Sequence, residues 1–470
     1  MKDTFVNRVA ELEFLEQSLA KSSAQLLVLY GRRRVGKTWL LQHLAHRSKV
    51  PVLYHVCVQT TPVDELSRLS RRLAEFFEDP VLAVQSLGSW EACLAYLGHQ
   101  AEKRPFGLLL DEFPYAVEGD PSLPSRLQAS WDARLRRTRI KLVLSGSSIS
   151  MMEDIGLSPR SPLHGRRTGQ WKLEPFGVRE IGLLWPMGSF EDVLSLYCVV
   201  GGSPMYVTQL EPSKGLAENI RDSILARGSL LYDEVPFLLR SELRSPRVYQ
   251  SILGAIARGA RKFSELSSKT GLERAHLTRY LATLCELGLV AREVPVTEWY
   301  PEKSRRGLYR IADHFVDFWY RFVFPNRDRL ECGDTAMVLE DEVLPSLDAY
   351  IAGSVEPVIG SLFRHDWVGR VPFVSAYSGR HWSNLEEFDW VLLDHSRTRA
   401  MVVEIKWSRA PIRGVGTMKD LARRAAACDA LRECSRTHAL VSRSGFADRP
   451  RSTGDELFVD LTTEALPWAG

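Results

Sequence analysis

The sequence has few cysteines, and their spacing excludes two classes of protein. The seven cysteines among 470 residues are scattered, odd in number and never arranged as CxxC. This pattern excludes a disulfide scaffold and gives no indication of a zinc site. Reduced thiols in a cytoplasm fit it best, so we expect a cytoplasmic protein.

Long apolar runs are also missing. The longest ones, such as residues 26–30 and 106–110, have the length of a strand, whereas a membrane span needs roughly 18 apolar residues. The first residues carry charges every few positions and lack the apolar core of a signal peptide. We therefore expect no membrane partner.

The chain has no strong excess of charge of either sign. Its 61 Lys and Arg and 58 Asp and Glu give a net charge of +3, which excludes a wholly basic nucleic-acid coat protein but not a single basic face. Hydrophobic residues make up 45% and charged residues 25%, as in ordinary globular proteins. At roughly 150 residues per domain, the length predicts about three domains.

The motif GRRRVGKT at residues 31–38 predicts a phosphate-binding loop. It lies between a β-prone run and the helical pattern TWLLQHLAHR, which is the context that GxxxxGK[ST] requires. Its backbone N–H groups would face phosphate oxygens, Lys37 would reach the β- and γ-phosphates, and Thr38 would bind Mg²⁺. The three arginines can contact phosphates, or they can be solvated or paired within the protein. The predicted nucleotide-binding residues are Gly31, Arg32, Arg33, Arg34, Val35, Gly36, Lys37 and Thr38.

Two further apolar strands are expected to end beside this loop. FGLLL ends in Asp111 and Glu112, where the first carboxylate suits a ligand of magnesium and the second can activate the attacking water. KLVLSGSS predicts a strand and a small polar loop, in which Ser145 or Ser147 could sense the γ-phosphate, although turn chemistry alone also favours serine and glycine. Arg166, in a loop, could reach a phosphate of the same or a neighbouring subunit.

Together these motifs resemble the archaeal-type ATPase family, in the signal-transduction branch of AAA-like P-loop ATPases. The resemblance covers about the first 210 residues and rests on FVNRVAELEFLE, the phosphate loop, LLLDEFPY, LSGSSISMM, SPLHGR and VVGGSPMYV. It implies an ATPase core over residues 1–172 and a helical lid over 173–240, with ATP and Mg²⁺ as cofactors. It also implies that Arg8 and Pro204 lie near the adenine, although GGSP also fits a plain turn between helices.

Residues 241–330 predict a winged-helix domain. SPRVYQSILGAIARG, KFSELSSKTG and LERAHLTRYLATLCELG read as three helices, and LVAREVPV and LYRI as strands around a wing that carries KSRR. Between residues 245 and 330, fifteen Lys and Arg outnumber nine Asp and Glu, a net +6. Arg274, His276 and Arg279 on the third helix would suit DNA, although such domains also serve as protein contacts or nucleotide-state levers.

Residues 331–470 contain two apolar strands, EEFDWVLLD and RAMVVEIKW, joined by a short polar turn. A tight turn pairs residues whose numbers sum to 793, so Asp389 would lie opposite Glu404 on one face of the sheet. Two carboxylates about 5 Å apart can share a divalent metal, and Lys406 on the same face could stabilise charge that develops on a phosphate. Alternating charge also marks a solvated sheet face.

This D…ExK arrangement resembles the core of the PD-(D/E)xK nucleases, and the region resembles the DUF234-type domain. The resemblance implies that Glu356, in the preceding helix, is a further ligand of Mg²⁺ or Mn²⁺.

The sequence thus predicts an α/β protein: a P-loop ATPase with a parallel sheet and a helical lid, a winged helix, and an α/β restriction-endonuclease-like domain. The leading hypothesis is a Mg²⁺-dependent ATPase that acts on DNA, and a homo-oligomer is compatible with it. The alternative is an ATP-gated regulatory switch whose nuclease-like domain is an inactive binding module.

Overall fold

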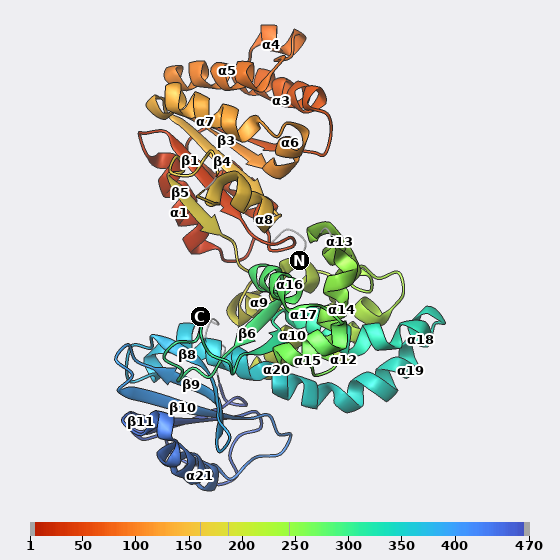
Figure 1. Cartoon of the computed structure of the whole chain (residues 1–470), viewed down its shortest axis with the longest axis vertical. Coiled ribbons are helices and arrows are strands. Elements are labelled where there is room, and N and C mark those ends of the chain that lie inside the picture. The colour runs from red at the N-terminus through yellow and green to blue at the C-terminus, as the bar shows by residue number, and fades with distance from the viewer. Residues whose placement is uncertain (1–4, 160, 187, 244, 465–470) are drawn as a thin grey trace. The chain divides into compact units, whose positions relative to one another are not determined.

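The computed structural model describes residues 5–159, 161–186, 188–243 and 245–464 (Figure 1). The chain forms two compact units. The N-terminal unit comprises Met1–Pro175 and Ser203–Met205, and the C-terminal unit comprises Phe176–Gly202 and Tyr206–Gly470. The expected lid, winged helix and nuclease-like region therefore lie in one unit, apart from residues 173–175 and 203–205 of the lid. Among the described residues, no helix is both long and apolar enough to cross a membrane.

The N-terminal unit is built on a parallel sheet with the strand order β2–β3–β4–β1–β5. Its central strands are buried along nearly their whole length, because helices cover both faces of such a sheet. The carboxyl ends of β1, β3 and β4 meet at one edge. The strands are β1 (Gln25–Tyr30), β2 (Val52–Val56), β3 (Phe106–Asp111), β4 (Ile140–Gly146) and β5 (Gly169–Lys172).

Successive residues of β1 enter different cores, as expected of a strand. Leu27 and Leu29 pack with α1 and α2, whereas Leu26 and Val28 pack with α3, α5 and α7. Figure 1 shows α3, α5 and α7 on one side of the sheet and α1 on the other. The helices of this unit are α1 (Val9–Ala20), α2 (Lys37–Arg47), α3 (Pro62–Phe77), α4 (Pro80–Val84), α5 (Trp90–Lys103), α6 (Phe113–Gly119), α7 (Leu123–Ala133) and α8 (Ile149–Met152).

The C-terminal unit begins with helices and continues into a winged helix. The aromatic stretch after β7 lies in the core, because Phe315, Phe318 and Trp319 are all buried. The elements are α9 (Val178–Leu184), α10 (Phe190–Val200), α12 (Leu216–Asn219), α13 (Glu234–Glu242), α14 (Pro246–Ala257), α15 (Phe263–Thr270), α16 (Arg274–Glu286), β6 (Val290–Glu293), β7 (Leu308–Ile311), α17 (His314–Phe318), the π-helical Trp319–Val323, α18 (Arg327–Glu331) and α19 (Thr335–Val338).

The last part of this unit is a mixed sheet with the order β12–β11–β10–β9–β8. β8, β9 and β10 are antiparallel neighbours, whereas β10, β11 and β12 are parallel. The predicted register is confirmed, because Val403 pairs with Trp390 and Ala400 with Leu393. The elements are α20 (Leu344–His365), β8 (Tyr377–Trp382), β9 (Glu387–Leu393), β10 (Arg399–Lys406), α21 (Gly414–Ala427), β11 (Ser435–Ser442) and β12 (Glu456–Asp460).

Helix α20 packs very closely on this sheet at Gly360. A Cβ atom at this position would lie 2.2 Å from the ring of Trp390 on β9. Only a residue without a side chain lets the helix backbone approach the ring so closely. This contact lies one helical turn from Glu356 and next to Asp389.

Candidate functional site

The phosphate loop joins β1 to α2, and close contacts fix its two glycines. A Cβ at Gly31 would lie 2.3 Å from the carbonyl oxygen of Leu173. Gly36 has φ +95°, in the left-handed region that favours glycine. The Nζ of Lys37 donates hydrogen bonds to the carbonyls of Gly31 (2.7 Å) and Arg32 (3.0 Å). The ammonium group is therefore buried inside the loop that would hold the phosphates.

The predicted magnesium ligands lie next to each other. The hydroxyl of Thr38 donates to Oδ2 of Asp111 at 2.8 Å, and Asp111 is buried at the end of β3. The hydroxyl of Tyr54, on β2, donates to the same oxygen at 2.9 Å. Burial and the Asp111 carboxylate raise the pKa of Tyr54, so this phenol remains a donor. A hydroxyl and a carboxylate at this edge of the sheet fit the oxygen ligands that Mg²⁺ prefers.

Glu112 is held by the serine loop after β4. Its Oε2 accepts hydrogen bonds from the N–H (3.2 Å) and the hydroxyl (2.8 Å) of Ser147. Of the two serines left open by the sequence, Ser147 is thus the one in contact with Glu112. Ser145 lies within β4 with its hydroxyl buried, and it has no hydrogen-bond partner among the described residues. Glu112 itself has φ +52°, a strained backbone of the kind found at functional sites.

The arginines of the loop make contacts within the protein. Arg32 is buried, and the guanidinium of Arg33 donates to the hydroxyl of Tyr115 at 2.9 Å. Arg34 has φ +72°, and its carbonyl accepts a hydrogen bond from Ser203 at 3.0 Å. The Arg33 side chain therefore agrees with the interpretation that these arginines pair within the protein.

Arg8 and Pro204 both lie against the phosphate loop. The guanidinium of Arg8 donates to the carbonyls of Val35 and Glu174, each at 2.9 Å, and pairs with Glu11. A Cβ built on Gly36 would be 3.9 Å from Cγ of Pro204. The opening segment and the GGSP segment thus both contact the phosphate loop, and their place near an adenine stays a prediction.

Arg166 lies apart from this group of contacts. Its guanidinium pairs with Asp132 of α7 at 3.0 Å and donates to the carbonyl of His164 at 3.2 Å. No hydrogen bond or ion pair found in the described part of the chain joins it to the phosphate loop, Asp111 or Glu112.

The winged helix exposes the basic face that the sequence predicts. Leu277, Leu281 and Leu284 of α16 are buried, while Arg274, His276, Thr278 and Arg279 are exposed. The wing also exposes two aromatic rings that the sequence analysis missed, Trp299 (69% exposed) and Tyr300 (66%).

In the C-terminal sheet, the register of β9 and β10 places Asp389 and Glu404 as neighbours on one face. Burial and the nearby Glu404 raise the pKa of Asp389 to about 6, and its Oδ2 accepts the N–H of Ile405 at 2.7 Å. Glu404 accepts hydrogen bonds from Lys406 (2.5 Å) and from Arg424 of α21 (2.9 Å). The contact of Arg424 is not predictable from the sequence motifs, because it comes from a separate helix.

Glu356 faces the same carboxylates from α20. Burial and Asp389 raise its pKa to about 7, and Nε of Arg380 lies 3.3 Å from its Oε2. In the part of the chain that the structure describes, the carboxylate oxygens of Glu356, Asp389 and Glu404 do not all lie within 4.8 Å of one another. Among the described residues, the only trio of His, Cys, Asp or Glu with all ligand atoms within 4.8 Å is His55, Cys57 and Glu65.

That buried trio lies beside the end of β2 and is satisfied by hydrogen bonds. Oε1 of Glu65 lies 2.7 Å from the ring of His55, and Oε2 accepts the N–H of Val58 at 3.2 Å and pairs with Arg68. Burial and Glu65 hold the pKa of Cys57 well above its usual range, so this thiol stays protonated. These contacts connect β2 to α3.

Three family comparisons match successive parts of the chain. Residues 5–210 match an ATPase domain predominantly from Archaea, residues 251–293 an IclR helix-turn-helix domain, and residues 319–419 the family DUF234, described as archaeal and bacterial proteins of unknown function. The ATPase, winged-helix and DUF234 assignments are therefore confirmed.

Individual proteins match the chain as well. A Walker-type ATPase of Pyrococcus abyssi has 21% identity and a TM-score of 0.50, covering 67% of this chain and 96% of its own, which supports the fold. An uncharacterized ATP-binding protein of Methanocaldococcus jannaschii is 52% identical over 46 residues, 10% of this chain and 78% of its own. An uncharacterized protein of the same organism is 31% identical over 461 residues, 97% of this chain and 99% of its own. The chain thus belongs to the archaeal-type P-loop ATPase family, with a helix-turn-helix domain and a C-terminal DUF234 domain.

Proposed function

We propose that the protein hydrolyses ATP with the help of Mg²⁺ and uses this reaction to act on DNA. The observation that carries the ATPase part is the pair of contacts Thr38–Asp111 and Glu112–Ser147. These contacts support a pair of magnesium ligands, Thr38 and Asp111, and a carboxylate base, Glu112, beside one phosphate loop. Hydrolysis needs both functions, whereas nucleotide binding alone does not need the base.

Each side chain of the site has a role in this reaction. Lys37 exchanges the loop carbonyls for phosphate oxygens when ATP binds, and the loop N–H groups hold the remaining oxygens. Thr38 and Asp111 would hold the metal, which would supply positive charge to the phosphates when bound. Glu112 orients the attacking water and accepts its proton, while Ser147 fixes the carboxylate.

The test of the ATPase part compares the wild type with Lys37→Ala. Steady-state phosphate release should fall at least about 100-fold, the usual effect of removing a group that stabilises the transition state. Arg136→Ala, at an exposed position in the same unit, is the control and should retain the wild-type rate. An undiminished rate in Lys37→Ala would disprove this site as the centre of hydrolysis.

We further propose that Glu356, Asp389, Glu404 and Lys406 form a metal-dependent nuclease-like centre. The supporting observation is that burial and Asp389 raise the pKa of Glu356 on α20, while burial and Glu404 raise the pKa of Asp389 on β9. A divalent cation would offset the repulsion between these neighbouring carboxylates. Asp389 and Glu404 would hold the metal, and Lys406 would stabilise a phosphate.

Plasmid nicking tests this centre. Supercoiled DNA is incubated with Mg²⁺ or Mn²⁺ and ATP, with the wild type, Asp389→Ala and the control Glu433→Ala, an exposed acid of the same region. We expect nicking by the wild type and the control alone. Nicking that persists in Asp389→Ala would remove the assignment.

One observation favours the second candidate, an ATP-gated switch with an inactive nuclease-like module. Both oxygens of Glu404 are bound by cations, Lys406 and Arg424, and Arg380 pairs with Glu356. A metal would have to displace these partners. If the wild type binds DNA and hydrolyses ATP but never nicks, the switch is the better description.

A further inference from the structure

A basic cavity lies within the C-terminal unit, outside the exposed face of the winged helix. It has a volume of about 700 Å³ and is bordered by the turn after α14, by β6 and β7, by the π-helical segment, and by α20 and β8. Five arginines and three acids border it, so the formal balance is positive. The arginines are Arg258, Arg261, Arg310, Arg321 and Arg380, and the acids are Glu293, Asp317 and Glu356.

The acids that border the cavity form ion pairs with only some of its arginines. Arg310 pairs with Glu293, and Arg380 pairs with Glu356 at 3.3 Å and with Glu387 at 2.6 Å. Arg258, Arg261 and Arg321 are exposed, and within the described ranges none of them has a carboxylate within 4.0 Å. Three cations without a carboxylate partner therefore border the same hollow.

The backbone that carries one of these arginines is held in place. The carbonyl of Arg261 accepts the N–H of Tyr309 on β7 at 2.8 Å, and the N–H of Arg261 donates to Glu265 at 2.9 Å. Guanidinium groups suit phosphate because their planar N–H donors match its oxygens in pairs. A fixed backbone loses little freedom when a phosphate binds.

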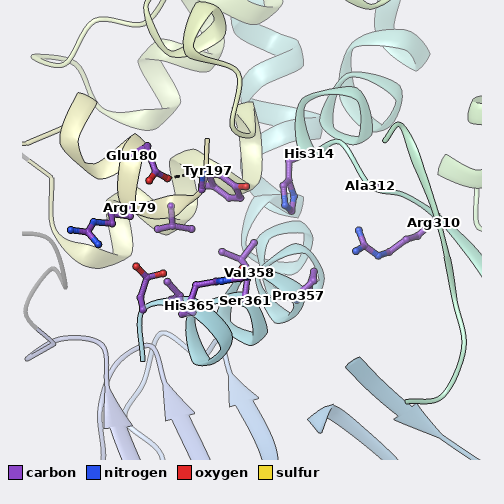
Figure 2. A pocket seen from close by; sticks show the side chains of 14 residues that line it. Arg179, Glu180, Tyr197, Arg310, Ala312, His314, Pro357, Val358, Ser361 and His365 are labelled. Carbon is purple, nitrogen blue, oxygen red and sulfur yellow. Dashed lines mark hydrogen bonds between the residues drawn. The ribbon is translucent and has the colours of Figure 1, made fainter. Parts of the chain in front are cut away.

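A second cavity extends the first. Its volume is about 470 Å³, and it shares Arg310, His314 and Pro357 with the first cavity. Figure 2 shows it with Arg310 and His314 on one side and Ser361 and His365 of α20 below them. Each volume lies in the range of a small-ligand site, so the two cavities together offer more room than one nucleotide occupies.

We propose that the basic cavity binds the phosphate groups of a single nucleic-acid strand on its way to Glu356. The inference rests on the proposed action on DNA and adds a strand type and a path. Glu356 itself borders the cavity, so a strand held there would meet the first carboxylate of the proposed centre. A single strand needs only a basic groove along its backbone, and the arginines that border the cavity supply one.

The test measures the anisotropy of a fluorescein-labelled 20-nucleotide single strand over a range of salt concentrations. The double variant Arg261→Ala/Arg321→Ala should bind about 10-fold more weakly. Its slope of log K against log salt should fall by about 1.4, because each lost phosphate contact contributes about 0.7 for a single strand. Arg261→Lys/Arg321→Lys keeps both charges and should keep most of the slope.

Two controls separate this inference from the proposed function. Arg451→Ala, an exposed arginine of the same unit outside the cavity, should bind as the wild type does. Arg274→Ala/Arg279→Ala on α16 should weaken duplex binding more than single-strand binding. Equal single-strand affinity in Arg261→Ala/Arg321→Ala, with duplex binding intact, would overturn the cavity proposal and leave the DNA function standing.

A third result would overturn both the cavity proposal and the proposed action on DNA. If the wild type binds neither duplex nor single strand, the proposed action on DNA fails. Thermal unfolding with AMP or pyrophosphate then identifies what the cavity takes. Stabilisation by these ligands that is lost in Arg261→Ala/Arg321→Ala would assign it to a small phosphate ester and not to a strand.

Discussion

The carboxylates at the phosphate loop and those near the C-terminal sheet have different kinds of hydrogen-bond partner. At the phosphate loop, neutral donors hold the acids: Thr38 and Tyr54 bind Asp111, and Ser147 binds Glu112. In the C-terminal unit, cations bind two of the three acids: Lys406 and Arg424 bind Glu404, and Arg380 pairs with Glu356. Hydroxyl groups orient a carboxylate and leave its charge for a metal or a water, whereas guanidinium groups cancel that charge. The first site is ready for its ligand, and the second must exchange its partners.

The largest effect is expected at Glu112, because Ser147 orients the carboxylate that we propose as the base in ATP hydrolysis. Glu112→Gln keeps the size and the hydrogen-bond acceptor for Ser147 but cannot take a proton, so ATP turnover should fall about 10²- to 10⁴-fold. The affinity for a fluorescent ATP analogue should change little. Glu75→Gln, an exposed acid on α3, is the matched control. Full turnover in Glu112→Gln would assign the base elsewhere.

The next effect concerns the cations at the second site. Arg424→Ala leaves Glu404 buried with one cation, Lys406, beside Asp389, and an incompletely paired buried charge is destabilising by about 3 kcal/mol. Urea unfolding of the full chain measures it. Adding Glu404→Gln to Arg424→Ala should restore most of the loss, and a pair of additive losses would contradict this account.

The pH dependence of stability should also differ between the sites. The pKa of Glu356 is raised to about 7 from about 4.3 in unfolded chains, so folding favours its protonated form. Its contribution is present below about pH 4 and is lost as the pH rises to 7. Glu356→Gln should therefore flatten the decline of the unfolding free energy between pH 4.5 and 7, by about 1–3 kcal/mol across that window. An unchanged slope would disagree with the raised pKa.

The smallest effect on stability is expected at Arg166. Its pair with Asp132 is partly exposed, and such pairs contribute about 0–1 kcal/mol. Arg166→Ala should therefore unfold almost as the wild type does. If copies of the chain supply Arg166 to one another, its ATPase rate should fall only at protein concentrations where the wild type self-associates. Sedimentation and phosphate release over a concentration series would detect this.

Local patterns were enough to predict much of this molecule. The phosphate loop, Asp111 and Glu112 are predicted by short motifs beside apolar strands. The pairing of β9 with β10 is predicted by the alternation of apolar residues and a tight turn. These features depend on residues that are close in sequence or paired across one turn.

The partners of the site residues could not be predicted in the same way. Tyr54 reaches Asp111 across 57 positions, and Arg424 reaches Glu404 across 20 positions from another element. Such contacts depend on helix and strand packing, which a single sequence does not specify. The choice between Ser145 and Ser147 also needed the structure, because it depends on where β4 ends.

The Gly360 contact has a consequence for how this chain tolerates change. With the ring of Trp390 in the place of a Cβ atom, even alanine would push α20 away from β9 and carry Glu356 away from Asp389. A saturation screen that selects for the proposed nuclease activity should find position 360 as intolerant as the acids themselves. Heritable damage to the proposed centre could therefore arise at a residue that has no functional group at all.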